Sequence, residues 1–242
     1  MVQAAGLGLA TLMKIGLMSD IHGNSPALEA VLPVLFAETD QVLFLGDLCG
    51  YYPFVEECIA LWDHERVVGV RGNHDQILLD CLQHHSLPPM TYQTRYGSAL
   101  ARTLQQISPS SVALFQGLPI SRTLTINGKV LALYHGTPWD PLEGRLYPND
   151  DHLDRLVDLP ADIILLGHTH YPFTRRYQDK LIVNPGSVGQ PRDRSGASVA
   201  ILDLATEVVE HRRVSFSPQR LIDDARQHDP GVPYLVEVLT RR

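Results

Sequence analysis

Short apolar runs alternate with amphipathic segments through the first third of the chain. Residues 14–18, 41–45 and 67–70 are apolar runs of strand length. Residues 25–38, 53–63 and 75–82 carry apolar positions at helical spacing, and the first of these segments opens with Ser25 as the expected N-cap and Pro26 at the first helical position. This alternation of strands and helices predicts a parallel sheet.

The pattern changes in the remainder of the chain. Helices are expected at 92–105 and 109–115, and Asn127-Gly128 between the alternating runs 123–126 and 130–135 predicts a β-hairpin. We further expect a helix at 151–159, strands at 163–166, 174–177, 181–183, 199–202 and 208–214, and helices at 220–227 and 234–239. The sequence contains no repeat or linker, so we predict two packed sheets in a single domain, residues 14–242.

Residues 1–13 are small and mostly apolar, without the basic start of a secretion signal, and Lys14 interrupts the apolar stretch well before membrane-spanning length. We interpret them as a loose N-terminal leader and expect no membrane association. Met13 is a candidate for the true start, because the first strand begins directly after it.

The composition narrows the class of protein. With 242 residues, of which 44% are hydrophobic and 19% charged, the chain is too apolar for disorder. A formal net charge of -7 argues against a stable nucleic-acid complex, so a bound phosphate must meet a local positive charge. Its three cysteines form no Cys-x-x-Cys pair, which fits a reducing cytosol, so we expect a cytoplasmic protein. The oligomeric state cannot be predicted from this sequence.

Polar residues follow five of the predicted strands at the point where each strand ends. They are Asp20 and His22, Asp47, Asn73 with His74 and Asp75, His135, and His168 with His170. Ligands of α/β proteins bind at the carboxyl edge of the sheet, so we expect these side chains to meet there.

Carboxylate, amide and imidazole groups without thiolates suit manganese, iron, zinc, cobalt or nickel better than calcium or magnesium. One tetrahedral ion needs fewer ligands than this sequence offers, and the two oxygens of Asp47 could bridge a pair of ions. We therefore expect two divalent or trivalent metal ions, with manganese, iron, zinc and nickel all open.

The ordered set of motifs resembles the calcineurin-like metallophosphoesterase superfamily. The motifs are Asp20-Ile21-His22, Gly46-Asp47-Leu48-Cys49-Gly50, Gly72-Asn73-His74-Asp75, His135 and Gly167-His168-Thr169-His170. Two further segments, 135–138 and 184–192, are similar to the small bacterial and archaeal phosphodiesterase-like branch. The resemblance implies a four-layer α/β/β/α sandwich with two mixed β-sheets.

The resemblance also implies roles for individual residues. One metal would be held by Asp20, His22, Asp47 and His170, and the other by Asp47, Asn73, His135 and His168. A hydroxide between the metals would attack phosphorus in line, and His74 would donate a proton to the leaving oxygen.

Two positions depart from the family pattern. Related protein phosphatases pair the proton donor with an aspartate where this chain has Gly50. Asp75 is therefore a second catalytic candidate that could orient His74 or its loop, or it could simply cap the following helix. Tyr52 stands where the branch commonly has glycine, and we expect it to narrow the mouth of the pocket.

We predict a small phosphoester substrate, a phosphodiester or nucleotide-type compound, contacted by Arg71, Asn73 and Arg192. A phosphomonoesterase, including a protein Ser/Thr phosphatase, is the alternative within the same chemistry. A catalytically idle binding module on the same fold is the alternative from another class of protein, although the complete ligand set argues against it.

Overall fold

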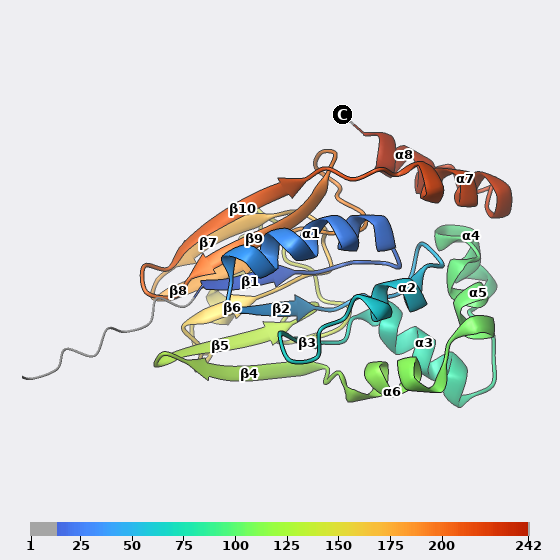
Figure 1. Cartoon of the computed structure of the whole chain (residues 1–242). Coiled ribbons are helices and arrows are strands. Elements are labelled where there is room, and N and C mark those ends of the chain that lie inside the picture. Colours follow the sequence, from blue (N-terminus) through green and yellow to red (C-terminus); the bar gives the residue numbers. More distant parts are fainter. Residues whose placement is uncertain (1–13, 242) are drawn as a thin grey trace, which may run out of the picture.

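Two five-stranded sheets form the centre of the computed structural model, which describes residues 14–241 (Figure 1). Sheet A contains β1 (Lys14–Met18), β2 (Gln41–Leu45), β3 (Val67–Val70), β9 (Ala197–Asp203) and β10 (Val208–Val214) in the order β10-β9-β1-β2-β3. Sheet B contains β4 (Ser121–Ile126), β5 (Lys129–Tyr134), β6 (Ile163–Leu165), β7 (Phe173–Tyr177) and β8 (Lys180–Asn184) in the order β4-β5-β6-β8-β7. The expected leader 1–13, with Met13, lies outside the described residues, and the single domain 14–242 stays a prediction.

Both sheets are mixed. The strands β1, β2 and β3 are parallel, as are β5, β6 and β8, whereas β9, β10, β4 and β7 pair antiparallel to their neighbours. The carboxyl ends of β1, β2 and β3 point toward the end of the molecule where helices α2 to α5 gather, on the right in Figure 1. Side chains that follow these strands therefore meet at one edge.

Alternation along the strands decides which core each side chain enters. Leu43 and Leu45 of β2 pack between the two sheets with Leu131 and Leu165 of sheet B. Phe44, which lies between the first two in sequence, faces the opposite way into the core under the helices. The fully buried parallel strands are accordingly almost continuous apolar runs.

Helices and loops cover the two outer faces. The helices are α1 (Ser25–Glu38), α2 (Val55–Ala60), α3 (Asn73–Gln83), α4 (Met90–Tyr96), α5 (Ala99–Gln106), α6 (Pro109–Gly117), α7 (Gln219–His228) and α8 (Tyr234–Thr240). The 3-10 helix η1 (His152–Leu156) packs Leu153 and Leu156 on the outer face of sheet B against Ile164 and Ile182. The predicted α/β class with two mixed sheets is confirmed, although the layer outside sheet B is a 3-10 helix with loops. Among the described residues no helix combines the length and apolar character needed to cross a bilayer.

Several element boundaries differ from the sequence-based expectation. Asn24, and not Ser25, caps α1, because its side chain accepts the N–H of Ala27. The expected helix 92–105 is two helices, since Gly97 adopts φ 82° and Asp229 takes the N–H of Ser98. The segments expected as helices at 53–63 and 151–159 contain only the short α2 and η1.

Candidate metal centre

All seven residues expected as metal ligands lie together at the carboxyl edge of the two sheets. They are Asp20 and His22 after β1, Asp47 after β2, Asn73 after β3, His135 after β5, and His168 and His170 after β6. None of them exposes more than 8% of its surface. Burying this many ionisable groups is costly unless they are paired or coordinate metal, so the cluster is a candidate metal centre.

Asp20, His22 and His170 form the first of two groups. Oδ1 of Asp20 lies 3.2 Å from Nε2 of His170 and 3.6 Å from Nε2 of His22, and these two nitrogens are 3.1 Å apart. Oδ2 of Asp20 accepts the backbone N–H of His168, whereas Oδ1 is buried with no hydrogen-bond partner among the described residues. An unsatisfied carboxylate oxygen and two nitrogens therefore face the same small space.

The second group is built around His135. Its Nε2 lies 3.1 Å from Nδ1 of His168, 3.1 Å from Oδ1 of Asn73 and 3.2 Å from Oδ2 of Asp47. The same Oδ2 of Asp47 is 3.8 Å from Nε2 of His22 in the first group. Asp47 thus faces both groups with one oxygen.

Backbone carbonyls fix the orientation of three of the four histidines. The Nδ1 atoms of His22, His135 and His170 lie 3.0, 2.7 and 2.7 Å from the carbonyl oxygens of Cys49, Leu45 and Gln190. A carbonyl oxygen only accepts, so each Nδ1 carries a proton and each Nε2 is the atom that faces the centre. The Nε2 atoms of His22 and His170 lie 3.1 Å apart, so two nitrogens of the type that ligates metals face one another across a small space. These donors fit transition-metal ions.

Five of the seven residues have left-handed backbone conformations that are unusual for non-glycine residues. They are Asp20 (φ 55°), His22 (φ 53°), Asp47 (φ 63°), His168 (φ 65°) and His170 (φ 64°). Each such residue costs about 1 to 3 kcal/mol and persists only where its surroundings enforce it. The loops interlock through backbone hydrogen bonds, including Asp20 N–H to Gly46 O at 2.8 Å and His22 N–H to Asp47 O at 3.0 Å. Stored backbone strain is typical of functional sites.

The buried charges hold one another without any metal. Burial alone would raise the pKa of Asp20 and Asp47, but the neighbouring histidines outweigh it and hold both pKa values well below the ordinary range. Burial also opposes a charge on His135, yet Asp47 and Asp20 raise its pKa to about 10, whereas burial lowers the pKa of His168 to about 3. His135 therefore carries a proton that a bound metal ion would displace.

The side chain of Asp75 holds the loop that carries Asp47 in place through hydrogen bonds. Its carboxylate accepts four backbone N–H groups, those of Asp47, Leu48, Cys49 and Gly72, at 2.8 to 3.1 Å. The bond to Gly72 also caps α3, as the alternative interpretation of Asp75 expected. Burial and the adjacent Asp47 raise the pKa of Asp75 to about 6 against these donors. All four of these bonds are to the backbone, so they support a positioning role for Asp75.

The imidazole of His74 is paired with a tyrosine. Its Nδ1 lies 2.5 Å from the hydroxyl oxygen of Tyr92, which reaches it from α4. At Gly50, where related protein phosphatases have aspartate, a Cβ atom would lie 2.7 Å from Nδ1 of His22 and 3.1 Å from Nδ1 of His74. Gly50 also has φ 141°, so no larger residue fits there. Tyr92 takes the place of the missing aspartate.

Arg71 and Arg192, both expected to contact substrate, have different surroundings in the structure. The guanidinium of Arg71 donates to the carbonyl of Leu118 at 2.9 Å and to the side chain of Gln76 at 3.0 Å. These bonds join the β3–α3 loop to the segment before β4, and they do not support a substrate contact for Arg71. Arg192 lies beside the centre and donates to the hydroxyl of Tyr51 at 3.3 Å.

Tyr52 does not narrow a pocket mouth. It is buried, and its hydroxyl donates to the carbonyl of Leu235 in α8 at 2.9 Å. The aromatic residue thereby fastens the C-terminal helices beside the metal centre.

The segment 184–192 supports the ligands from behind. The hydroxyl of Ser187 and the N–H of Gly189 both donate to the carbonyl of Asp20, at 2.8 and 2.9 Å, while the carbonyl of Gln190 holds His170. Asn184 donates to the carbonyl of Gly167, at the start of the loop that carries His168 and His170. The sequence motif of this segment is typical of the family, but it did not predict which residues the segment contacts. Nothing in the sequence predicted that Tyr92 contacts His74.

The fold and the site together define a metallophosphoesterase-type protein, and comparison with known proteins agrees. Residues 13–207 match the calcineurin-like phosphoesterase superfamily domain, so the chain belongs to that superfamily, whose members are metal-dependent. This confirms the resemblance found in the sequence.

Three individual proteins extend the comparison. An uncharacterized protein of Methanocaldococcus jannaschii is 32% identical over 221 residues, covering 84% of this chain and 87% of that protein. Phosphodiesterase YfcE of Escherichia coli is 28% identical over 212 residues, covering 79% and 88%. The crystal structure of a metallophosphoesterase from Sphaerobacter thermophilus aligns with a TM-score of 0.77 and 28% identity, covering 95% of this chain and 99% of that one.

Proposed function

We propose that the chain hydrolyses phosphodiester or nucleotide-type phosphate bonds at a centre of two metal ions. The observation that carries this proposal is the position of Asp47, whose Oδ2 lies within 4 Å of Nε2 of both His22 and His135. A carboxylate shared by two groups of nitrogen donors is the arrangement that holds a pair of ions. Manganese, iron, zinc and nickel all suit these donors.

The residues divide into two ligand sets. Asp20, His22, Asp47 and His170 would hold one ion, and Asp47, Asn73, His135 and His168 would hold the other. When bound, the ions supply positive charge that attracts a phosphate and make a water molecule acidic enough to attack phosphorus. The protein keeps the ligands rigid through the carbonyl bonds to Nδ1 and through the carboxylate of Asp75.

His74 is the group placed to supply a proton to the leaving oxygen. Its backbone N–H donates to Oδ1 of Asp47 at 2.9 Å, which fixes the ring beside the centre. Burial lowers the pKa of His74 to about 3, so the protonated ring needs a neighbouring negative charge, which a bound phosphate provides. The hydroxyl of Tyr92 can donate or accept, so it pairs with Nδ1 in either protonation state and leaves Nε2 for the substrate.

Two observations favour diester over monoester substrates. A relative that matches over most of its length is named a phosphodiesterase. Gly50 removes the aspartate expected beside the proton donor in protein Ser/Thr phosphatases, and its surroundings leave no space for one. A phosphomonoesterase is therefore the alternative in the same chemistry.

The test is to strip the protein of metal and restore manganese, iron, zinc or nickel one at a time. Hydrolysis of bis-p-nitrophenyl phosphate, p-nitrophenyl phosphate and a dinucleoside polyphosphate is then compared. We expect metal-dependent cleavage of the diester or dinucleotide, absent in Asp47→Ala and retained in the exposed control Asp179→Ala. A preference for the monoester would support the phosphatase alternative, and metal binding without any turnover would support an idle binding module.

A further inference from the structure

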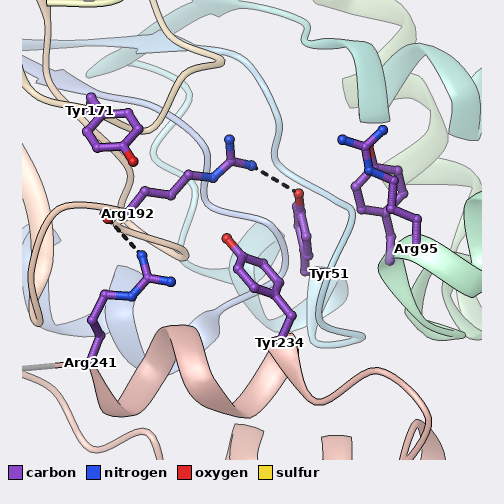
Figure 2. Close-up of a pocket in the computed structure, with 7 residues that line it drawn as sticks. Tyr51, Arg95, Tyr171, Arg192, Tyr234 and Arg241 are labelled. Carbon is purple, nitrogen blue, oxygen red and sulfur yellow. Dashed lines mark hydrogen bonds between the residues drawn. The ribbon is translucent and has the colours of Figure 1, made fainter.

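A cavity of about 400 Å³ adjoins the metal centre. Its lining includes Arg95, Arg192 and Arg241 together with Tyr51, Tyr171 and Tyr234 (Figure 2). The volume is within the range of about 300 to 1,000 Å³ that small-molecule sites occupy.

Tyr51 is the wall between the cavity and the metal centre. Its ring centroid lies 4.5 Å from that of His22 and 5.3 Å from that of His74. On the cavity side, its hydroxyl accepts a hydrogen bond from Arg192 at 3.3 Å. The cavity and the metal centre are therefore neighbours on the two sides of Tyr51.

The cavity concentrates positive charge that no carboxylate balances. Within residues 14–241, none of the ion pairs formed by arginine or lysine includes Arg95, Arg192 or Arg241. No aspartate or glutamate lines the cavity, and Nε of Arg192 is buried without a partner in the described part of the chain. Three arginines left unpaired in a chain of net charge -7 call for an anionic ligand. Guanidinium groups suit phosphate through paired N–H donors.

The tyrosines add flat apolar surface to this charge. Tyr171 and Tyr234 approach the cavity from opposite sides, with the side chain of Arg192 between them, as Figure 2 shows. Both rings are half-buried, and Arg95 lies over the ring of Tyr96 at 5.1 Å. Aromatic and guanidinium planes of this kind bind nucleobases by stacking.

Part of the cavity comes from outside the region that matches the superfamily. Tyr234 and Arg241 belong to α8 and the residue after it, beyond residue 207 where the match ends. The bond from Tyr52 to the carbonyl of Leu235 holds this helix in place, and Arg241 donates to the carbonyl of Arg192 at 2.7 Å. Helix α8 and the residue after it thus form one wall of the cavity.

We infer that this cavity binds the part of the substrate beyond the reacting phosphorus, and that this part carries a further phosphate and a nucleobase. The substrate class is then a nucleotide with more than one phosphate, with the distal phosphate held by the charges of Arg95, Arg192 and Arg241 and the base against the tyrosines. This inference rests on the proposed function for its catalytic meaning, but the binding site itself is testable without turnover.

The first measurement is calorimetric titration of the metal-free protein with a methylene-bridged adenosine triphosphate analogue and with inorganic tripolyphosphate. We expect the nucleotide to bind at least about tenfold more tightly than tripolyphosphate, because stacking adds to the charge term. Arg95→Met and Arg241→Met should each weaken nucleotide binding at least about tenfold, whereas Arg226→Met, an exposed change of the same type on α7, should not. The side chain of Arg95 donates no hydrogen bond to the backbone of residues 14–241, so replacing it removes no bond that holds a loop.

The second measurement uses the metal-loaded protein and the ratio of kcat/KM for diadenosine tetraphosphate to kcat/KM for bis-p-nitrophenyl phosphate. We expect Arg95→Met to lower this ratio about tenfold or more. Equal nucleotide affinity in wild type and both variants, or equal affinity for nucleotide and tripolyphosphate, would overturn the inference. Nucleotide binding with the expected variant pattern but no turnover with any metal would instead overturn the proposed function and leave the binding site standing.

Discussion

The hydroxyl oxygen of Tyr92 lies 2.5 Å from Nδ1 of His74. In related protein phosphatases an aspartate at the position of Gly50 pairs with the proton-donating histidine. Here the contact with Tyr92 takes the place of that pair. A tyrosine hydroxyl is neutral, and burial raises its pKa well above the ordinary value, so it orients the ring without adding a negative charge.

Tyr92→Phe should slow the hydrolysis of substrates with poor leaving groups by about tenfold, because His74 loses the contact that sets its orientation. His74→Ala should slow the same substrates by about 100-fold or more. Both variants should keep their metal and should cleave p-nitrophenyl esters with smaller losses, since that leaving group needs little protonation. The measurement is kcat across a series of leaving groups, together with metal content.

Tyr177→Phe is the matched control for that series. Tyr177 lies on β7, away from the centre, and its hydroxyl donates a hydrogen bond to the carboxylate of Asp154 in η1. The substitution removes that hydroxyl. A uniform loss for all leaving groups in Tyr92→Phe would contradict a role in proton donation and indicate general disruption.

Gly50→Asp should not create a better catalytic pair. The new Cβ would lie 2.7 Å from Nδ1 of His22, and the backbone at φ 141° is unfavourable for any residue but glycine. We expect a lower melting temperature and loss of metal binding. Gly117→Asp, at a position with open space around the Cβ, should leave both unchanged. Higher activity in Gly50→Asp would show that the loop rearranges to accept the aspartate.

Asp75→Asn should destabilise the protein by about 2 kcal/mol or more and weaken metal binding. The substitution replaces one acceptor oxygen with an NH₂ group that faces backbone N–H donors from Asp47, Leu48, Cys49 or Gly72. Urea unfolding and metal titration measure the two effects. Asp80→Asn, an exposed change on the same helix, is the control. Equal stability and metal affinity in the two variants would contradict the role of Asp75 in holding the loop that carries Asp47.

The metal-free protein should lose stability as the pH falls from 7 to 5. Burial lowers the pKa of His74 and His168 to about 3 and that of His170 to about 4, whereas an unfolded histidine titrates near about 6.5. Near pH 5 these three rings therefore bind protons on unfolding. Asp75 opposes them with one proton, because its folded pKa is raised to about 6. Unfolding near pH 5 therefore takes up about three protons on the histidines and releases about one from Asp75, a net uptake of about two. The free energy of unfolding then falls by about 2 to 3 kcal/mol for each pH unit of acidification.

Urea unfolding midpoints at pH 7, 6 and 5 measure this dependence. His135 has its pKa raised to about 10 and is protonated in both states at pH 5, so it contributes only at higher pH. His168→Asn should reduce the slope by about one proton. Stability that increases toward pH 5 would contradict the neutral state of the buried histidines.

The sequence predicted the strand ends of the site well because the cause is local. An apolar run followed directly by a polar residue defines both the strand and the point where its side chain leaves the sheet, as for β2 and Asp47. The parallel strands then bring those ends to one edge without further information.

Contacts between distant segments could not be predicted in the same way. Tyr92 of α4 meets His74 of α3 although the two are 18 residues apart in the chain. Gly97 separates α4 from α5 through a left-handed turn supported by Asp229. The cavity depends on a bond between Tyr52 and the carbonyl of Leu235, 183 residues apart in the chain. The bond from Arg71 to the carbonyl of Leu118 shows the same limit, since Leu118 belongs to another loop.

The central claim is that Asp47 joins two metal ions into one catalytic centre, and metal stoichiometry tests it most directly. Metal-stripped wild type and Asp47→Ala would be titrated with manganese while bound metal and bis-p-nitrophenyl phosphate turnover are recorded together. We expect two ions per wild-type chain, turnover that requires both, and loss of both ions in Asp47→Ala. One ion per chain at full activity, or turnover that persists without metal, would contradict it.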